Sequence, residues 1–202
     1  MPALPLRQRR LDLVYVLFFA VNAGFVTYII DLEALVIQDT GNFTQPIWPP
    51  EPLVDLIHWY GRTYDPLLMA RPPFWQATMW IDVLLFGPFY LLAIYAFIRG
   101  RNWIRVPALV WSGMMMSNVL IILMDERYGV TPPPNYAFVV ALNLPWLLLP
   151  LAVIWRMRRD QPFSRPAFGR PPTSAALPDA DRPTSVDQSI GVETAGQRSG
   201  AA

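Results

Sequence analysis

The chain has 202 residues, of which 53% are hydrophobic and 15% are charged. The formal net charge is +1, so the composition gives no reason to expect a nucleic-acid partner. Cysteine is absent, which excludes disulfides, thiol catalysis and cysteine metal sites. The single histidine, His58, cannot form a haem pair or a histidine metal cluster, and we predict neither a metal nor a cofactor.

Four long apolar segments dominate residues 1–160. Each has about 20 residues, the length that an α-helix needs to cross the hydrocarbon layer of a membrane. The segments are Leu11–Ile30, Trp75–Ile98, Val106–Met124 and Tyr136–Trp155. The first is too long for the apolar region of a signal peptide, and no small-x-small cleavage site follows it. We therefore predict an all-α integral membrane protein whose domain, residues 1–160, is a four-transmembrane-helix bundle.

The arginines predict how this bundle is oriented. All 16 basic residues are arginine, and those that flank the apolar segments are unevenly divided between the two sides. One side has Arg7, Arg9, Arg10, Arg99, Arg101, Arg105, Arg156, Arg158 and Arg159, whereas the other has only Arg62, Arg71 and Arg127. The positive-inside rule then places both termini and the 99–105 loop in the cytoplasm. The membrane would be the cell membrane in a bacterium and the endoplasmic reticulum in a eukaryote.

Two segments outside the spans have distinct compositions. Residues 161–202 are rich in Pro, Ser, Thr and Ala, and we expect a disordered cytoplasmic tail. The long non-cytoplasmic loop after the first span contains Pro52–Tyr60, which places Leu53, Leu56, Ile57 and Tyr60 on one helical face. We expect an ordered loop whose short amphipathic helix folds over the mouth of the bundle. The alternative is a surface helix in the headgroup region, and in either case we expect His58 at the surface.

Asp82 is the most unusual residue of the predicted spans. At 1.5 Å per residue it lies roughly 12 Å into a hydrocarbon layer about 30 Å thick. A charged carboxylate at the centre of a span costs about 2.5–3.5 kcal/mol on insertion scales. Such a residue is tolerated when it faces the bundle interior, finds a partner or stays protonated, so Asp82 is the first candidate for function.

Other polar residues have both a structural and a functional interpretation. Asp31 ends the first span, where a boundary charge that meets water is as plausible as a binding role. Asp65 precedes a proline, and turn chemistry alone accounts for such a pair. Asn118 and Asn143 lie in the third and fourth spans. Hydrogen bonding between helices is the usual role of such residues, and lining a binding pocket is the functional alternative. Asp12 lies close to three arginines in the sequence, so we predict an ion pair at the membrane interface.

Several short segments together resemble the EXPERA family, and most closely its sigma-2 receptor branch. The resemblance covers residues 7–157 and the order and spacing of all four spans. The matching segments are Asp31–Ala34, Trp59–Tyr60, Tyr64–Leu68, Arg71–Pro73, Gly87–Phe89, Tyr95–Phe97, Trp103–Ala108 and Leu147–Pro150. It implies a four-helix bundle with an internal pocket that opens toward lipid and accepts sterols and hydrophobic amines. Homodimers would also fit the family.

The same resemblance implies roles for particular residues. Asp31 would hold the cationic amine of a ligand, and Asp65, from the loop, would support it. Asp82 stands where the family has a glutamate on the second span. Asn118 matches a polar residue on the third span, and Trp146 matches an aromatic residue on the fourth.

The family also contains a sterol isomerase branch, the emopamil-binding proteins. The spacing of Asn143 and Trp146 matches that branch, but its histidine on the first span falls at Thr27, which joins the ligand-binding candidates. Moving a ring double bond needs two acid/base groups that face one ring system, and here these would be Asp31 and Asp82. The leading hypothesis is a membrane protein that binds sterol-like or polycyclic lipids and hydrophobic amines. A sterol or terpenoid double-bond isomerase and a structural subunit without a ligand are the alternatives.

Overall fold

The computed structural model describes residues 4–164, and the regular structure in that range is entirely helical. Residues 165–202, which form most of the predicted tail, lie outside the described residues. The elements in chain order are η1 (Leu6–Gln8), α1 (Asp12–Val21), η2 (Asn22–Asp31), α2 (Leu32–Val36), α3 (Glu51–Thr63), α4 (Leu67–Ala70), α5 (Pro73–Ile81), η3 (Asp82–Phe86), α6 (Gly87–Arg99), η4 (Asn102–Ile104), α7 (Arg105–Tyr128), α8 (Tyr136–Asn143) and α9 (Pro145–Arg156).

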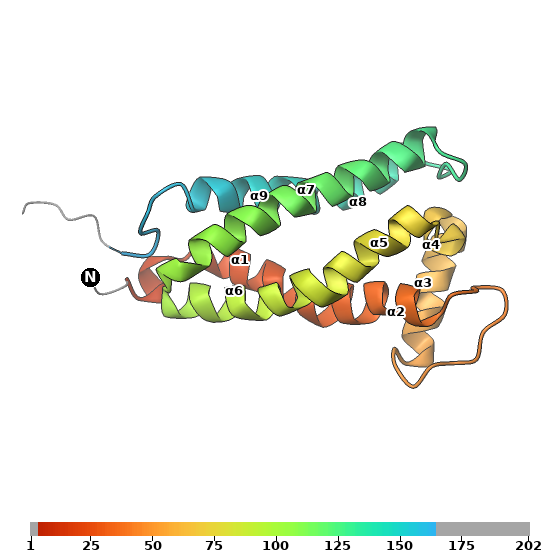
Figure 1. The fold of residues 1–202 in the computed structure, drawn as a ribbon, viewed down its shortest axis with the longest axis horizontal. Helices are drawn as coiled ribbons and strands as arrows, with labels where there is room; N and C mark the ends of the chain where they lie inside the picture. Colours follow the sequence, from red (N-terminus) through yellow and green to blue (C-terminus); the bar gives the residue numbers. More distant parts are fainter. Residues whose placement is uncertain (1–3, 165–202) are drawn as a thin grey trace, which may run out of the picture. The chain divides into compact units, whose positions relative to one another are not determined.

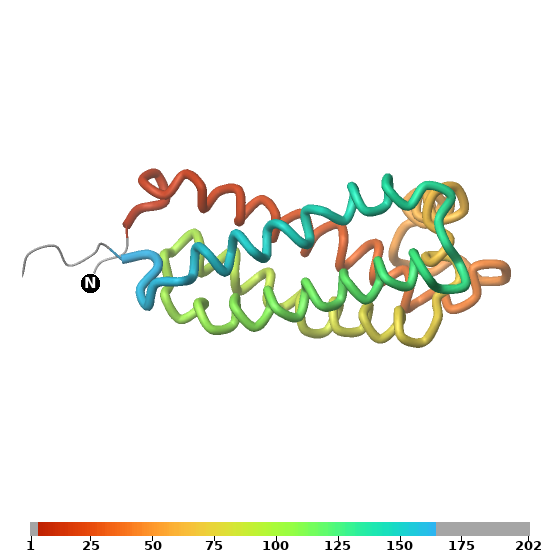
Figure 2. The backbone as a smooth tube through the Cα atoms, turned by 90° about the horizontal axis from the view of Figure 1, so that it is seen from above, coloured from red at the N-terminus to blue at the C-terminus, as the bar shows by residue number. Residues whose placement is uncertain are grey.

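Consecutive elements combine into four helical segments that are long and apolar enough to cross a membrane. These are Asp12–Val36, Pro73–Arg99, Asn102–Tyr128 and Tyr136–Arg156. They run alongside one another in both views of the backbone (Figures 1 and 2). The four-span prediction is therefore confirmed, and the first span continues to Val36 instead of ending at Ile30.

The first two spans each contain a π-helical segment. The segment η2 lies between α1 and α2 in the first span and ends at Asp31, whereas η3 begins at Asp82 and lies between α5 and α6 in the second span. The two segments pack against each other. Because π-helical turns inside α-helices are frequent at functional sites, they draw attention to the two acids.

The loop between the first two spans contains the predicted amphipathic helix. This helix, α3, lies with α4 at the end of the bundle opposite the N-terminus (Figures 1 and 2). Its buried residues are Val54, Ile57, His58 and Gly61, whereas Leu56 is 47% exposed. The helix is therefore where the sequence predicted it, but its buried face is rotated from the predicted one.

An aromatic cluster holds the four spans together. The ring centroid of Trp111, on α7, lies 5.4 Å from that of Phe19 on α1 and 5.3 Å from that of Phe89 on α6. Phe18 extends the cluster to Trp146 on α9, at 6.4 Å. Aromatic residues combine large buried areas with specific ring geometry, so the cluster both stabilises the bundle and fixes how its helices meet.

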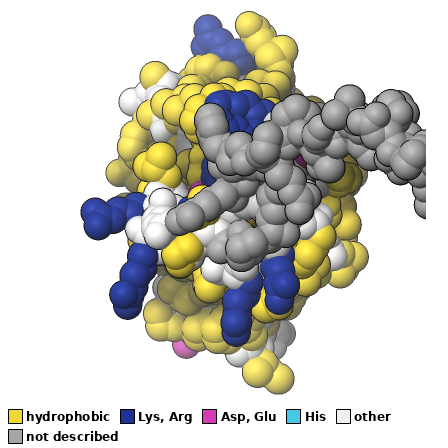
Figure 3. Space-filling model, turned by 90° about the vertical axis from the view of Figure 1, so that its left-hand side faces the viewer, with side chains coloured by type: hydrophobic (Ala, Val, Ile, Leu, Met, Phe, Trp, Pro, Cys, Tyr) yellow, Lys and Arg dark blue, Asp and Glu magenta, His cyan; other side chains and the backbone are white. Residues whose placement is uncertain are grey.

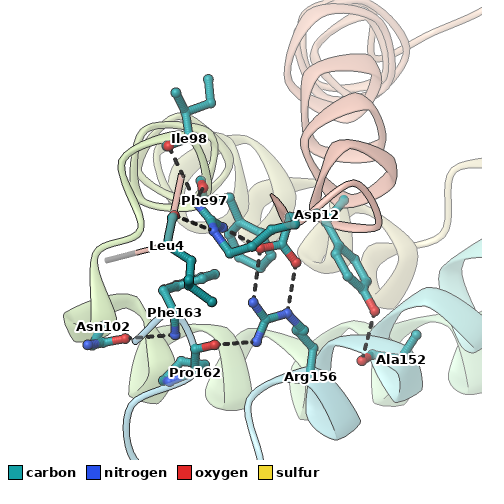
Figure 4. A network of polar contacts seen from close by, with 11 residues as sticks. Leu4, Asp12, Phe97, Ile98, Asn102, Ala152, Arg156, Pro162 and Phe163 are labelled. Atoms are coloured by element: carbon teal, nitrogen blue, oxygen red, sulfur yellow. Dashed lines mark hydrogen bonds and ion pairs between the residues drawn. The ribbon is translucent and has the colours of Figure 1, made fainter. Parts of the chain in front are cut away.

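A buried ion-pair network closes the end of the bundle where the chain begins (Figure 4). Asp12 accepts a hydrogen bond of 2.8 Å from Nε of Arg156 and a further one from Arg9, which confirms the predicted ion pair. Arg9 also donates to the carbonyl of Phe97 at 3.0 Å. Both guanidinium groups lie 4.9 Å from the ring centroid of Phe163, which is fully buried, so the packed chain continues past residue 160. Arginine side chains also gather around this face of the molecule (Figure 3).

Candidate functional site

A cavity of about 460 Å³ lies between the four spans and the loop helices. Its walls are mainly apolar and aromatic, and its size falls within the range of small-molecule sites. Six of the seven predicted ligand-binding residues line it: Asp31, Asp65, Asp82, Asn118, Asn143 and Trp146. The structure thus brings together acids that are up to 51 positions apart in the sequence.

Asp31 and Asp82 come from η2 and η3 and lie within electrostatic range of each other. Asp31 is only 5% exposed, and its Oδ2 atom is buried without a hydrogen-bond partner. Thr27, the seventh candidate, is fully buried and does not line the cavity. Its hydroxyl donates to Oδ1 of Asp82 at 3.1 Å, so Thr27 positions this carboxylate from behind.

Asp65 approaches the cavity from the loop, between α3 and α4. Burial raises the pKa of its carboxyl to about 6, although the backbone amides of Leu67 and Leu68 partly offset the effect. Its Oδ1 atom is buried without a partner. Nearby, burial raises the pKa of Tyr60 to about 12, with further contributions from the negative charges of Asp65 and Glu126.

Glu126 is an acid of the cavity that the sequence reasoning missed. It lies near the end of α7, is 1% exposed, and has a buried Oε2 atom without a partner. It was not among the predicted site residues, because it stands beside Asp125 at the boundary of a span, where charged residues commonly meet water. A signal was available, since residues two helical turns apart share a face and Glu126 follows the candidate Asn118 by eight positions.

The three remaining polar candidates differ in whether their side chains already have hydrogen-bond partners. Trp146 donates from Nε1 to Oδ1 of Asn22 at 2.7 Å, which ties the fourth span to the first. Asn143 donates to the carbonyl of Val139 in its own helix at 3.0 Å. Asn118 has a buried Nδ2 atom without a partner, so its amide has hydrogen-bonding capacity left for a ligand.

A second buried cluster anchors the loop helix beside the cavity, and it corrects the prediction for His58. This residue is 3% exposed, and its Nε2 atom lies 2.8 Å from Oε1 of Glu33 on α2. Arg71 donates to both oxygens of Glu33, at 2.8 and 2.7 Å. The surface prediction for His58 was wrong because the acid that faces it lies 25 positions earlier in the chain. None of the three residues lines the cavity.

The cavity is lined by acidic side chains and by no basic ones. Four carboxyl groups line it, from Asp31, Asp65, Asp82 and Glu126, and no arginine or histidine does. Within residues 4–164 the ion pairs involve other acids, namely Asp12, Glu33 and Asp160. In the same range no group of three or more His, Asp or Glu residues could hold a metal ion. An apolar cavity with unpaired carboxyl groups is suited to an organic cation that has an apolar body.

These features define a multi-pass helical membrane protein with an acidic cavity beside a helical loop. The family model described as EXPERA (EXPanded EBP superfamily) matches residues 52–157, so the chain belongs to this family. Sigma intracellular receptor 2 of Xenopus tropicalis is 28% identical over 160 residues, which cover 74% of this chain and 88% of the relative. Sigma intracellular receptor 2 of Homo sapiens is 28% identical over 149 residues, which cover 67% and 80%. The resemblance to the sigma-2 receptor branch is thereby confirmed.

Proposed function

We propose that the protein binds sterol-like or other polycyclic lipids and hydrophobic amines in the acidic cavity. The observation that carries the proposal is the combination of apolar walls with four carboxyl groups and no basic residue. Membership of the EXPERA family and similarity to sigma intracellular receptor 2 support it. A homodimer and cytoplasmic termini are further parts of the same proposal.

The rim of the cavity supports entry of the ligand from the bilayer. Phe25 on the first span and Leu142 on the fourth both line the cavity and are 41% and 42% exposed. In a membrane these side chains would face lipid, so an apolar ligand could pass from the hydrocarbon layer to the cavity without crossing water.

Asp31 is the proposed anchor for the amine. Its unpaired Oδ2 atom would accept a hydrogen bond from the ammonium group. Charge attraction is strong in a dry site, because little water screens it. Asp82, held by Thr27, would share the positive charge from the opposite wall.

Binding of a radiolabelled hydrophobic amine to wild type and to Asp31→Asn tests this proposal. Removing one partner of a buried charge pair costs about 3–5 kcal/mol, so we expect at least a hundredfold loss of affinity. Asp55→Asn is the matched control, since Asp55 is an exposed acid on α3 outside the cavity. Equal affinity in Asp31→Asn and wild type would refute the anchor role.

One observation favours an isomerase as the second candidate function. Asp31 and Asp82 lie within electrostatic range of each other, so two acid/base groups face one cavity. Incubation of the purified protein with unsaturated sterols in deuterated water would reveal deuterium uptake and a shifted double bond. The absence of both for several sterols would leave binding alone.

The third hypothesis is a structural subunit whose carboxyl groups only tie helices together. Extraction of lipids from the purified protein, followed by mass spectrometry, separates this hypothesis from the other two. We expect a polycyclic lipid that is depleted when Asp31 or Asp82 is substituted. Recovery of bulk membrane lipids alone would favour the structural role.

A further inference from the structure

We propose that the cavity has a second cation site, formed by Asp65, Glu126 and Tyr60, and that its full ligand is a hydrophobic diamine. This inference rests on the proposed function, because it assumes that the cavity binds amines. It adds Glu126 to the site, and it narrows the ligand class from hydrophobic amines in general to those that carry two cationic groups.

The four acids form two groups rather than one. Asp31 and Asp82 belong to the two π-helical segments and lie within electrostatic range of each other. Glu126 and Asp65 are within electrostatic range of each other, and both act on the phenol of Tyr60. One group thus belongs to the first two spans and the other to the loop and the end of the third span.

The helix positions separate the two groups by depth. Asp82 lies nine residues into the second span, whereas Glu126 lies two residues before the end of the third span at the same side of the bundle. At 1.5 Å per residue these depths are roughly 13 Å and 3 Å. Asp31, five residues before the end of the first span at that side, lies roughly 7 Å deep, between them. An ammonium group that contacts Asp82 is therefore separated in depth from Glu126 by on the order of 10 Å, whereas a ligand with a charge at each end can reach both.

Buried polar atoms without partners occur at both ends of the cavity. Asp31 Oδ2 lies at the deep end, and Asp65 Oδ1 and Glu126 Oε2 lie at the loop end. Asp65 and Glu126 are 5% and 1% exposed, and no arginine of residues 4–164 forms an ion pair with either. A buried acceptor without a partner is costly, and one ligand amine would satisfy only the deep end.

The chemistry of the loop end favours an ammonium group over a neutral polar one. When ionised, the two carboxyl groups offer acceptors and no donor, and the Tyr60 hydroxyl adds a further acceptor. Tyr60 and Trp59 also line the cavity, and aromatic faces attract cations. Between the ends the walls are apolar, which fits a rigid hydrocarbon frame.

The decisive experiment compares two probes on one frame. One is an androstane with an amine at carbon 3, and the other carries amines at carbons 3 and 17. Equilibrium binding of both would be measured in nanodiscs with wild type, Glu126→Gln, Asp65→Asn and the control Asp125→Asn. Asp125 is the neighbouring acid on α7 and does not line the cavity.

We expect wild type and Asp125→Asn to bind the diamine at least tenfold more tightly than the monoamine, the size of one charge-assisted hydrogen bond. Glu126→Gln and Asp65→Asn should lose most of the preference for the diamine, which is measured as the ratio of the two affinities within one variant. Retained monoamine binding also shows that each variant is folded. If Glu126→Gln does not fold, Asp65→Asn carries the comparison alone.

Three results would overturn the inference, and only the last would also overturn the proposed function. Equal affinity of wild type for both probes would refute the second cation site and leave the amine-binding function standing. The same would follow if the preference persisted in both Glu126→Gln and Asp65→Asn. Failure of wild type to bind either probe would refute the proposed function together with the inference.

Discussion

At the scale of single residues, the raised pKa of Asp65 makes the charge of the cavity depend on pH. An Asp-Pro pair in the sequence does not by itself predict such a shift. Burial is the main reason that its pKa rises from 3.8 to about 6. A raised pKa means that ionisation of Asp65 costs the folded state, so the stability it contributes is present below pH 3.8 and is lost as the pH rises through about 6. A bound ammonium group would compensate that cost.

We therefore predict that the affinity for a hydrophobic diamine increases as the pH rises through about 6, because only the ionised carboxylate of Asp65 attracts the second ammonium group. The measurement is amine binding between about pH 5 and 7, with a ligand that stays protonated throughout. The other cavity acids also titrate, so the comparison is between wild type and Asp65→Asn. A pH profile that is the same in both would contradict this role of Asp65.

At the scale of elements, the buried cluster of Glu33, His58 and Arg71 fixes the loop helices to the end of the first span. Each of the three side chains is at most 4% exposed. Arg71 follows α4 with a φ of 46°, and its guanidinium also donates to the carbonyl of Ile37. The cluster thus joins α2, α3 and the residue after α4, which positions Asp65 between them.

Glu33→Gln should detach this loop from the bundle. Loss of the carboxylate leaves a buried guanidinium without its partner, which costs about 3–5 kcal/mol. Thermal unfolding in detergent, followed by circular dichroism, would show a clear drop in midpoint. Glu51→Gln, an exposed position in the first turn of α3, should change the free energy of unfolding by no more than about 1 kcal/mol, and a similar shift in both variants would argue against the anchor.

These elements also show what the sequence could and could not reveal. The spans and α3 were predictable because hydrophobic pattern is a local property of the chain. The buried face of α3 was not predictable, because His58 is buried against Glu33, which lies far from it in the sequence and also pairs with Arg71. The local sequence pattern did not predict the π-helical segments either. Of the acids that line the cavity, Asp82 was predicted from its depth in a span and Asp31 and Asp65 from the resemblance, whereas Glu126, at a span boundary, was not predicted.

At the scale of the whole molecule, the two ends of the bundle differ in charge. Arginines gather at the end where the chain begins (Figure 3), whereas the cavity acids lie toward the loop helices. This asymmetry predicts that the arginine-rich end faces the cytoplasm, because basic residues near span ends are retained on that side.

Single cysteines offer a direct measurement of this orientation, because the chain has none of its own. Gln8 and Val130 are exposed and lie at opposite ends of the bundle. In sealed membranes with the non-cytoplasmic face outward, an impermeant maleimide should label Val130→Cys at once. It should label Gln8→Cys only after the membrane is permeabilised, and the reverse pattern would contradict the predicted orientation.

The π-helical segment η2 has a consequence for how the chain can change length. It begins directly after α1, which carries Asp12 of the ion-pair network, and it ends at Asp31, two residues before Glu33. One residue more or less in the α-helical part of the span would rotate the Asp31 end against the Asp12 end by about 100°. A π-helical turn already holds one residue more than an α-helical turn, so removal of one residue from η2 would tighten a wide turn toward α-helical geometry. We therefore expect the first span to tolerate the loss of one residue in η2 better than the loss of one residue in α1.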